Sequence, residues 1–142
     1  MFKDILLCVD LAHESSWTKA LPAAVDLCNH WGATLHVLNV VPDFGLSLVS
    51  QYFPEGYEQE VKQKALGDLR DFVKANLPAG IKVQHIVGEG TVYDVILKTI
   101  EEISADLVVM SAHRADLKDY LLGPNAARVV RHANCSVMVV RE

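Results

Sequence analysis

A group of residues that could bind an anion follows the fourth apolar run of the chain. Ser111 supplies a hydroxyl, Arg114 a guanidinium and Asn125 amide donors. Gly123 is suited to be the N-cap of a helix whose first residue is Pro124, a position that proline favours. The start of a helix presents free N–H groups and the positive end of its dipole, so an anion could bind there. Pro124 has no N–H and removes one of these donors.

Two further side chains raise the question of binding or catalysis. Asp10 closes the first apolar run, and a carboxylate there can accept hydrogen bonds from a ribose diol. Its alternative role is local, because an Asp at a turn also accepts hydrogen bonds from nearby backbone N–H groups. His113 could be a general base, but a lone loop histidine is more often a hydrogen-bonded structural group. No Ser/His/Asp, Cys/His, CxxC or HExxH spacing is present, so we assign no catalytic residue and no metal site.

Five short apolar runs are the predicted strands that would position these side chains. They cover Asp4–Asp10, Ala33–Val41, Ile81–Val87, Asp106–Met110 and Ser136–Val140. Four of the runs have almost no polar interruption, which is typical of strands that are covered on both faces of a parallel sheet. The third run alternates with polar residues, which indicates an edge strand or a strand with one exposed face.

Segments with helical periodicity separate the five runs. They cover Ser15–Trp31, Gly56–Leu77, Thr91–Ile103 and Pro124–His132. In the first segment, Pro22 should bend the helix or mark its true start, and Gly32 should end it. In the last segment, Ala127 and Val130, with Val129, are predicted to face inward. The strict alternation predicts a doubly wound α/β sheet with right-handed crossovers, formed by one domain over residues 1–142.

In such a sheet, ligands bind beyond the carboxyl ends of the strands, where the strand order reverses. This rule directs attention to Asp10 and Ser111, which end the first and fourth strands. Gly88 and Gly90 follow the third strand, but glycines at such turns often serve backbone geometry alone. The loop 42–54 carries several large apolar side chains. It is either a surface loop packed on its own domain or a flap over a ligand or a patch for a partner.

Composition limits the classes of partner and compartment. The chain has 142 residues and a net charge of −5, so a nucleic-acid partner is not expected. Its three cysteines, Cys8, Cys28 and Cys135, are widely spaced, which favours a reducing compartment without disulfides. Cys8 and Cys135 lie in apolar runs and are predicted to be small core residues. The N-terminus lacks the apolar core of a signal peptide and no run is long enough to span a membrane, so we expect a cytoplasmic protein.

Three segments of the chain resemble the universal stress protein family. They are DILLCVD at the start, LHVLNVV in the second strand and MSAHRADLKDYLLGPNAARVVRHANCSVMVV at the end. The resemblance covers essentially the whole chain in order. It implies a five-stranded parallel sheet with the strand order 3-2-1-4-5, in which the order reverses between the first and fourth strands.

One branch of this family binds ATP through a Gly-x2-Gly-x9-Gly-(Ser/Thr) signature, from which this chain departs. Ser111 and Arg114 stand in place of the first two glycines, and eight residues rather than nine precede Gly123. Pro124 replaces the Ser or Thr that normally contacts phosphate. The resulting pattern SxHR…YLLGxNA resembles a subgroup that still includes nucleotide binders. The Arg114 side chain narrows the approach to phosphate, but its guanidinium can replace lost N–H contacts with charge-assisted bonds.

Carried over by position, the resemblance implies a site for ATP, ADP or AMP, with Mg²⁺ as an accompanying ion. Asp10 would hold the ribose, and Val9 with the backbone of Val40 would border the adenine. The residues implied around the phosphates are Ser111, His113, Arg114, Gly123 and Asn125.

The last strand implies a homodimer, because in the family this strand pairs with its copy in a second subunit. A bare apolar edge invites such pairing. The centre of the interface would be Val137, Met138, Val139 and Val140. The leading hypothesis is a nucleotide-binding regulator that acts on a protein partner such as a transporter or another regulator. The alternatives are a homodimeric interaction module that binds no nucleotide, and a weak ATPase or self-phosphorylating protein.

Overall fold

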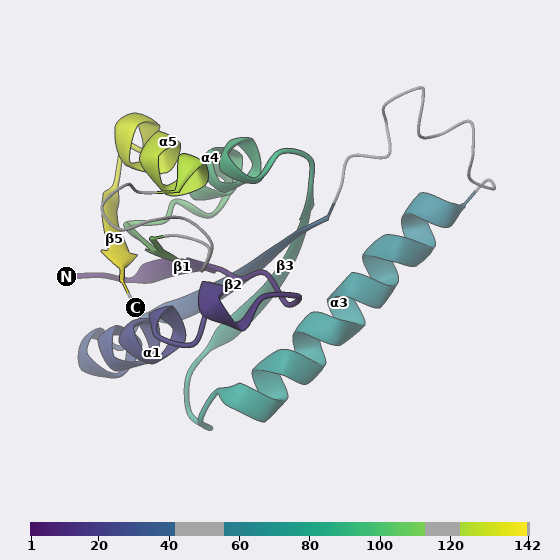
Figure 1. Cartoon of the computed structure of the whole chain (residues 1–142). Coiled ribbons are helices and arrows are strands. Elements are labelled where there is room, and N and C mark those ends of the chain that lie inside the picture. Colours follow the sequence, from purple (N-terminus) through teal and green to yellow (C-terminus); the bar gives the residue numbers. More distant parts are fainter. Residues whose placement is uncertain (42–55, 113–122, 142) are drawn as a thin grey trace.

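The computed structural model describes residues 1–41, 56–112 and 123–141, which form one five-stranded parallel sheet with helices on both faces (Figure 1). The strand order is β3-β2-β1-β4-β5, as the resemblance implies. The strands are β1 (Asp4–Cys8), β2 (Thr34–Val41), β3 (Val83–Glu89), β4 (Leu107–Ser111) and β5 (Ser136–Val140). The helices are the 3₁₀ turn η1 (Glu14–Ser16), α1 (Ala20–Trp31), α3 (Tyr57–Asn76), α4 (Val92–Ile103) and α5 (Pro124–His132).

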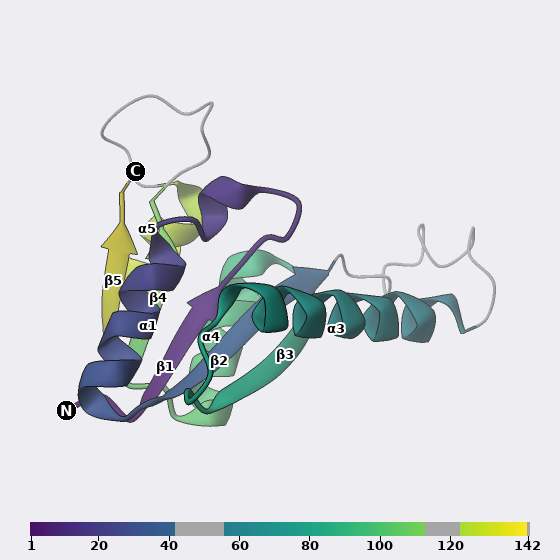
Figure 2. The same ribbon diagram turned by 90° about the horizontal axis from the view of Figure 1, so that it is seen from below.

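Both faces of the sheet are covered, which explains the uninterrupted apolar runs. On one face, Ile5 and Leu7 of β1 pack with Leu21 of α1 and Leu69 of α3. On the other face, Leu6 packs in a second cluster with side chains of α4 and α5. Figure 2 shows α1 and α3 on one side of the twisted strands and α4 and α5 on the other. Because neighbouring strand residues point to opposite faces, successive apolar residues in the middle of β1 and β4 are buried alternately in the two clusters.

Several strand bounds differ from the prediction by one or two residues, and two of the differences matter for the site. β1 ends at Cys8, so Val9 and Asp10 belong to the loop that follows the strand. The Val9 N–H still donates to the Leu38 carbonyl at 2.9 Å, which holds the start of this loop against β2. β3 runs to Glu89, so Gly88 lies inside the strand rather than after it.

The first helical segment begins later than its periodicity suggests. A 3₁₀ turn occupies Glu14–Ser16, and α1 starts at Ala20. Pro22 is therefore the third residue of α1, in the first turn, where a missing N–H removes no intrahelical hydrogen bond. This confirms that Pro22 marks the true start. Gly32 ends the helix with φ of 65°, a left-handed conformation that glycine adopts without strain.

The predicted inward face of α5 is confirmed at Val129 but is wrong at Ala127 and Val130. Ala126 and Val129 are buried, whereas Ala127 is exposed and Val130 is 47% exposed. Each helical residue turns the side chain by about 100°, so a shift of one position exchanges the buried and exposed faces. The helix starts at Pro124 as expected, but only its contact with α4 and β5 sets its rotation.

Both sheet edges are where the sequence placed them. β3 pairs only with β2, and β5 pairs only with β4, among the described residues. On β5, Val137 and Val139 pack toward α4 and α5, while Met138 lies on the other face and is 37% exposed. None of the helices in the described ranges has the length and apolarity to cross a membrane. The loop 42–54 lies outside the described residues.

Candidate functional site

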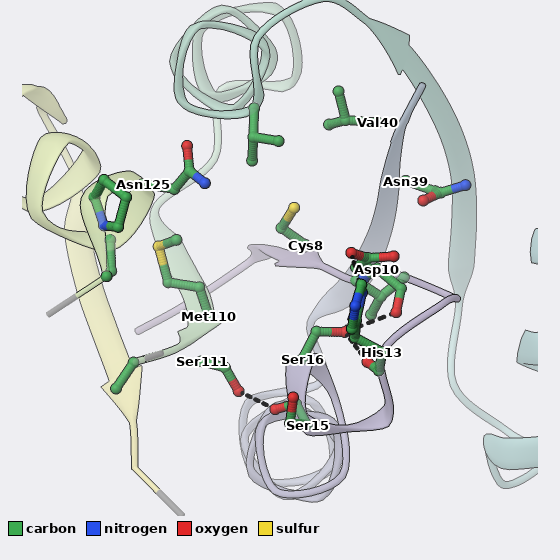
Figure 3. A pocket seen from close by; sticks show the side chains of 16 residues that line it. Cys8, Asp10, His13, Ser15, Ser16, Asn39, Val40, Met110, Ser111 and Asn125 are labelled. Carbon is green, nitrogen blue, oxygen red and sulfur yellow. Dashed lines mark hydrogen bonds and ion pairs between the residues drawn. The ribbon is translucent and has the colours of Figure 1, made fainter. Parts of the chain in front are cut away.

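A cavity of about 510 Å³ lies at the carboxyl ends of β1, β2 and β4, beside the first turn of α5 (Figure 3). This is the place where the strand order reverses, since β1 pairs with both β2 and β4. Six of the predicted site residues line it, namely Val9, Asp10, Val40, Ser111, Gly123 and Asn125. The other two, His113 and Arg114, lie outside the described residues.

Asp10 directs its carboxylate into a tight turn at the cavity wall. Its Oδ1 accepts the N–H of Ala12 at 3.0 Å, and its Oδ2 lies 2.8 Å from Nδ1 of His13. The predicted alternative of a local turn contact is therefore present. About half of the Asp10 side chain remains exposed. Each carboxylate oxygen has two acceptor directions, so the group can still receive hydrogen bonds from a ligand.

Ser111 connects two walls of the cavity. Its hydroxyl donates to the carbonyl of Ser15 at 2.8 Å, which ties the end of β4 to the loop that follows β1 (Figure 3). This hydroxyl therefore donates its proton to a protein carbonyl and not to a ligand. The oxygen of Ser111 keeps a lone pair that can accept a further hydrogen bond.

The first turn of α5 forms the side of the cavity that suits an anion. Gly123 is the N-cap and Pro124 the first helical residue, as predicted. The Gly123 N–H donates to the Ala112 carbonyl at 2.6 Å, which anchors the helix start to the end of β4. The N–H groups of Asn125 and Ala126 come next, at positions that lack intrahelical partners in a regular helix. With the helix dipole, they favour a negatively charged group.

The remaining wall is apolar and contains two sulfur-bearing side chains, Cys8 and Met110. Burial, together with a smaller contribution from the negative charge of Asp10, raises the pKa of the Cys8 thiol to about 12. The thiol therefore stays protonated at neutral pH and serves as a packing surface, not a nucleophile. Cys8 was predicted as a core residue, but it is only partly buried and faces the cavity. Within the described lining, Asp10 is the single carboxylate and no lysine or arginine occurs.

Sequence reasoning missed several lining residues. They are Cys8, His13, Ser15, Ser16, Asn39, Val92, Met110, Ala112 and Ala126. Asn39 carried a usable signal, because it is a polar residue near the end of an apolar strand. His13, Ser15 and Ser16 carried none, because they reach the cavity only through the fold of the loop after β1.

Gly88 lies where a side chain of α4 packs closely on β3. A Cβ at residue 88 would lie 2.3 Å from Cγ1 of Val95, which is a severe overlap. Only glycine therefore allows β3 and α4 to approach this closely. Gly90, directly after β3, serves backbone geometry, since its φ is 131°, whereas Gly88 is needed for close packing.

Comparison with known proteins shows which proteins this chain is similar to. A family model described as the universal stress protein family matches residues 1–141. Universal stress protein G of Escherichia coli O157:H7 is 29% identical over 143 residues, which span 99% of this chain and all of that protein.

Three solved structures share the fold. The hypothetical protein MJ0577 superposes with a TM-score of 0.81 at 24% identity, covering 100% of this chain and 97% of that one. A universal stress protein in complex with cAMP gives a TM-score of 0.67 at 22% identity, covering 99% and 97% of the two chains. A universal stress protein family protein from Arabidopsis thaliana with AMP bound gives 0.61 at 15% identity, covering 99% and 92%.

Proposed function

Since the chain belongs to the universal stress protein family, we propose that it binds an adenine nucleotide (ATP, ADP or AMP) as a regulatory signal. Two of the structural neighbours carry cAMP or AMP. The protein would act as a binding regulator and not as an efficient enzyme, since the described part of the cavity offers no activated nucleophile.

One observation carries this proposal. The cavity joins three chemically different walls at the point where the strand order reverses. Asp10 gives an acceptor for hydroxyl groups, the start of α5 gives donors for an anion, and the apolar wall suits a flat base. These three walls would suit the sugar, the phosphate and the base of a nucleotide, respectively.

The assignments within the site follow from these walls. Asp10 would accept hydrogen bonds from the ribose hydroxyls. Val9 and Val40 would border the adenine, and Cys8 would lie beneath it. The phosphates would face Ser111, Gly123 and Asn125 at the start of α5. His113 and Arg114 follow Ser111 in the sequence, and we propose that they belong to the same phosphate-binding segment.

Isothermal titration calorimetry with AMP, ADP, ATP and cAMP, each with and without Mg²⁺, tests this proposal. We expect saturable binding of at least one of the first three ligands, and a weaker affinity in Asp10→Asn. Asp94→Asn on α4 is the matched control, because it removes a carboxylate that does not line the cavity. Absence of binding at high micromolar protein and ligand would refute the proposal. An Asp10→Asn variant that binds as tightly as wild type would refute the assignment of Asp10 to the ribose.

We also propose that the protein forms a homodimer through β5 in the cytoplasm. β5 has one strand neighbour among the described residues, and Met138, which is 37% exposed, lies on it. Pairing of two copies of this edge would place Val137, Met138, Val139 and Val140 at the interface. Sedimentation velocity should give a dimer for wild type and a monomer for Met138→Lys. A monomeric wild type would refute the dimer.

Nucleotide occupancy would change the affinity of this dimer for a protein partner such as a transporter or another regulator. The start of α5 contacts the cavity, and the same helix packs on β5. A ligand at the start of α5 would thus be linked to the proposed dimer interface on β5 through this one helix. The alternative is a homodimeric interaction module without nucleotide, which the edge position of β5 supports equally. A dimer that binds none of the tested nucleotides would favour this alternative.

A further inference from the structure

The loop between β1 and α1 is organised around one hydroxyl, that of Ser16 (Figure 3). Its Oγ accepts the N–H of Asp10 at 2.8 Å. The same oxygen lies 2.9 Å from the Asp10 carbonyl and 2.7 Å from the His13 carbonyl. A serine hydroxyl has one proton, so it donates to one of these carbonyls at a time. Ser16 therefore holds the Asp10 N–H, while its own proton is available to the carbonyl of either Asp10 or His13.

The Asp10 side chain is oriented by residues of the same turn. The Ala12 N–H holds one carboxylate oxygen and the His13 ring holds the other. The turn itself closes through backbone bonds, from the His13 N–H to the Asp10 carbonyl at 3.0 Å and from the Ser16 N–H to the His13 carbonyl at 3.1 Å. The direction of the carboxylate is thus set relative to a backbone that Ser16 holds in place.

A second contact positions this loop in the cavity. The hydroxyl of Ser111 donates to the carbonyl of Ser15, the residue before Ser16. The loop is therefore joined to the end of β4 as well as to β1. A carboxylate held in this way needs little reordering when a ligand arrives, and preorganisation of this kind increases affinity.

We propose that Ser16 is a positioning residue for the Asp10 carboxylate, and that through it the site distinguishes a ribose with its 2′- and 3′-hydroxyls from one without them. The inference rests on the proposed function, because it assigns the Asp10 carboxylate to the sugar of the bound nucleotide. Ser16 also lines the cavity, but its hydroxyl is engaged with the backbone of the loop, so we place its effect on the ligand in the orientation of Asp10. Its removal should therefore affect only ligands that offer hydroxyls to Asp10.

The test compares AMP with 2′,3′-dideoxyadenosine 5′-monophosphate by calorimetry in wild type and three variants. Wild type should bind AMP more tightly than the dideoxy compound. Ser16→Ala should weaken AMP binding about fivefold, the equivalent of one net hydrogen bond. It should leave the affinity for the dideoxy compound unchanged, so the ratio of the two affinities falls. Ser16→Thr keeps the hydroxyl and should restore the ratio.

Thr18→Ala is the matched control in the same segment. Thr18 Oγ1 donates to the Glu14 carbonyl at 2.6 Å, so this variant also removes a hydroxyl–carbonyl bond, but one that does not touch Asp10. Its affinity ratio should equal that of wild type. A thermal unfolding curve of each variant reports any general loss of stability separately from the ratio.

The outcomes separate this inference from the proposed function. Wild type that binds no AMP would overturn both. If wild type binds AMP and Ser16→Ala keeps the wild-type ratio, the positioning role is refuted and nucleotide binding stands. A ratio that falls equally in Thr18→Ala would also refute the role, because a general loosening of the loop would then explain the effect.

Discussion

Replacement of Gly88 by alanine is expected to destabilise the protein through a single steric contact. Gly88 lies in β3, opposite Val40 of β2. Its added Cβ would lie 2.3 Å from Cγ1 of Val95 and 3.4 Å from Cδ1 of Leu38. Val95 belongs to the buried cluster under α4 and cannot turn away without disturbing its neighbours. The helix must therefore shift away from the sheet, or Val95 must leave its rotamer.

The net effect follows from two opposing contributions to the free energy of unfolding. Overpacking of a core costs about 1–3 kcal/mol. Replacement of a strand glycine by alanine recovers about 0.5–1 kcal/mol, because glycine loses more backbone entropy on folding. Since the overlap at Val95 is severe, the clash should prevail, with a net loss of about 1–2 kcal/mol. For a chain of this size, each kcal/mol lowers Tm by about 2–4 °C.

Urea unfolding followed by circular dichroism measures this loss, and two further variants test its cause. Gly67→Ala is the matched control, because Gly67 lies within α3 and a Cβ there meets nothing within 4 Å. It should be stabilising by about 0.5–1 kcal/mol. The double variant Gly88→Ala/Val95→Ala should be more stable than the sum of its single changes, because the new methyl group fills the space that Val95 vacates.

Two results would refute this reasoning. The first is a Gly88→Ala protein as stable as Gly67→Ala, which would mean that the gap between β3 and α4 is not tight. The second is strict additivity of Gly88→Ala and Val95→Ala, which would place the loss elsewhere than at their contact.

Three other predictions concern the cysteines and α5. Burial raises the pKa of the Cys8 thiol to about 12 and that of Cys28 to about 11, from about 9. Neither should therefore react with iodoacetamide at pH 8 in the native state, and rapid labelling by mass spectrometry would contradict this. Above pH 9 the unfolded chain loses thiol protons that the folded chain retains, so stability should fall between pH 9 and about 11–12. Urea unfolding midpoints at pH 8 and pH 10.5 measure this loss of stability. The loss should be smaller in a Cys8→Ala/Cys28→Ala variant. An equal loss in that variant would show that the thiols are not its cause. Val129→Ala should cost about 1–3 kcal/mol through a cavity, whereas Val130→Ala should change stability by less than about 0.5 kcal/mol. Equal losses in urea unfolding would contradict the observed rotation of α5.

Much of the site was predictable because the fold obeys a positional rule. Asp10 and Ser111 were selected as polar side chains at the ends of apolar runs, and both line the cavity. Gly123 and Pro124 were assigned to a helix start from their own chemistry, and the structure has them there. These inferences needed nothing beyond the type of each residue and its place next to an apolar run.

The other lining residues depend on contacts that no short stretch of sequence encodes. Ser16 reaches Asp10 because a 3₁₀ turn, and not a helix, occupies Glu14–Ser16. The carbonyl of Ser15 meets Ser111 across 96 positions of the chain. Such contacts depend on how the elements pack, and propensity alone does not determine them.

The amino-acid sequence by itself determined the succession of strands and helices along the chain, the doubly wound class, the place of Pro22 in the first turn of α1 and the end of that helix at Gly32. Each of these depends on local backbone preference or on apolar periodicity, which act over a few residues. Only the tertiary structure decided the rotation of α5, the closeness of α4 to Gly88 and the network that holds Asp10. These depend on the simultaneous packing of elements that are distant in the chain, where a displacement of one residue or one methyl group changes which side chain faces the cavity.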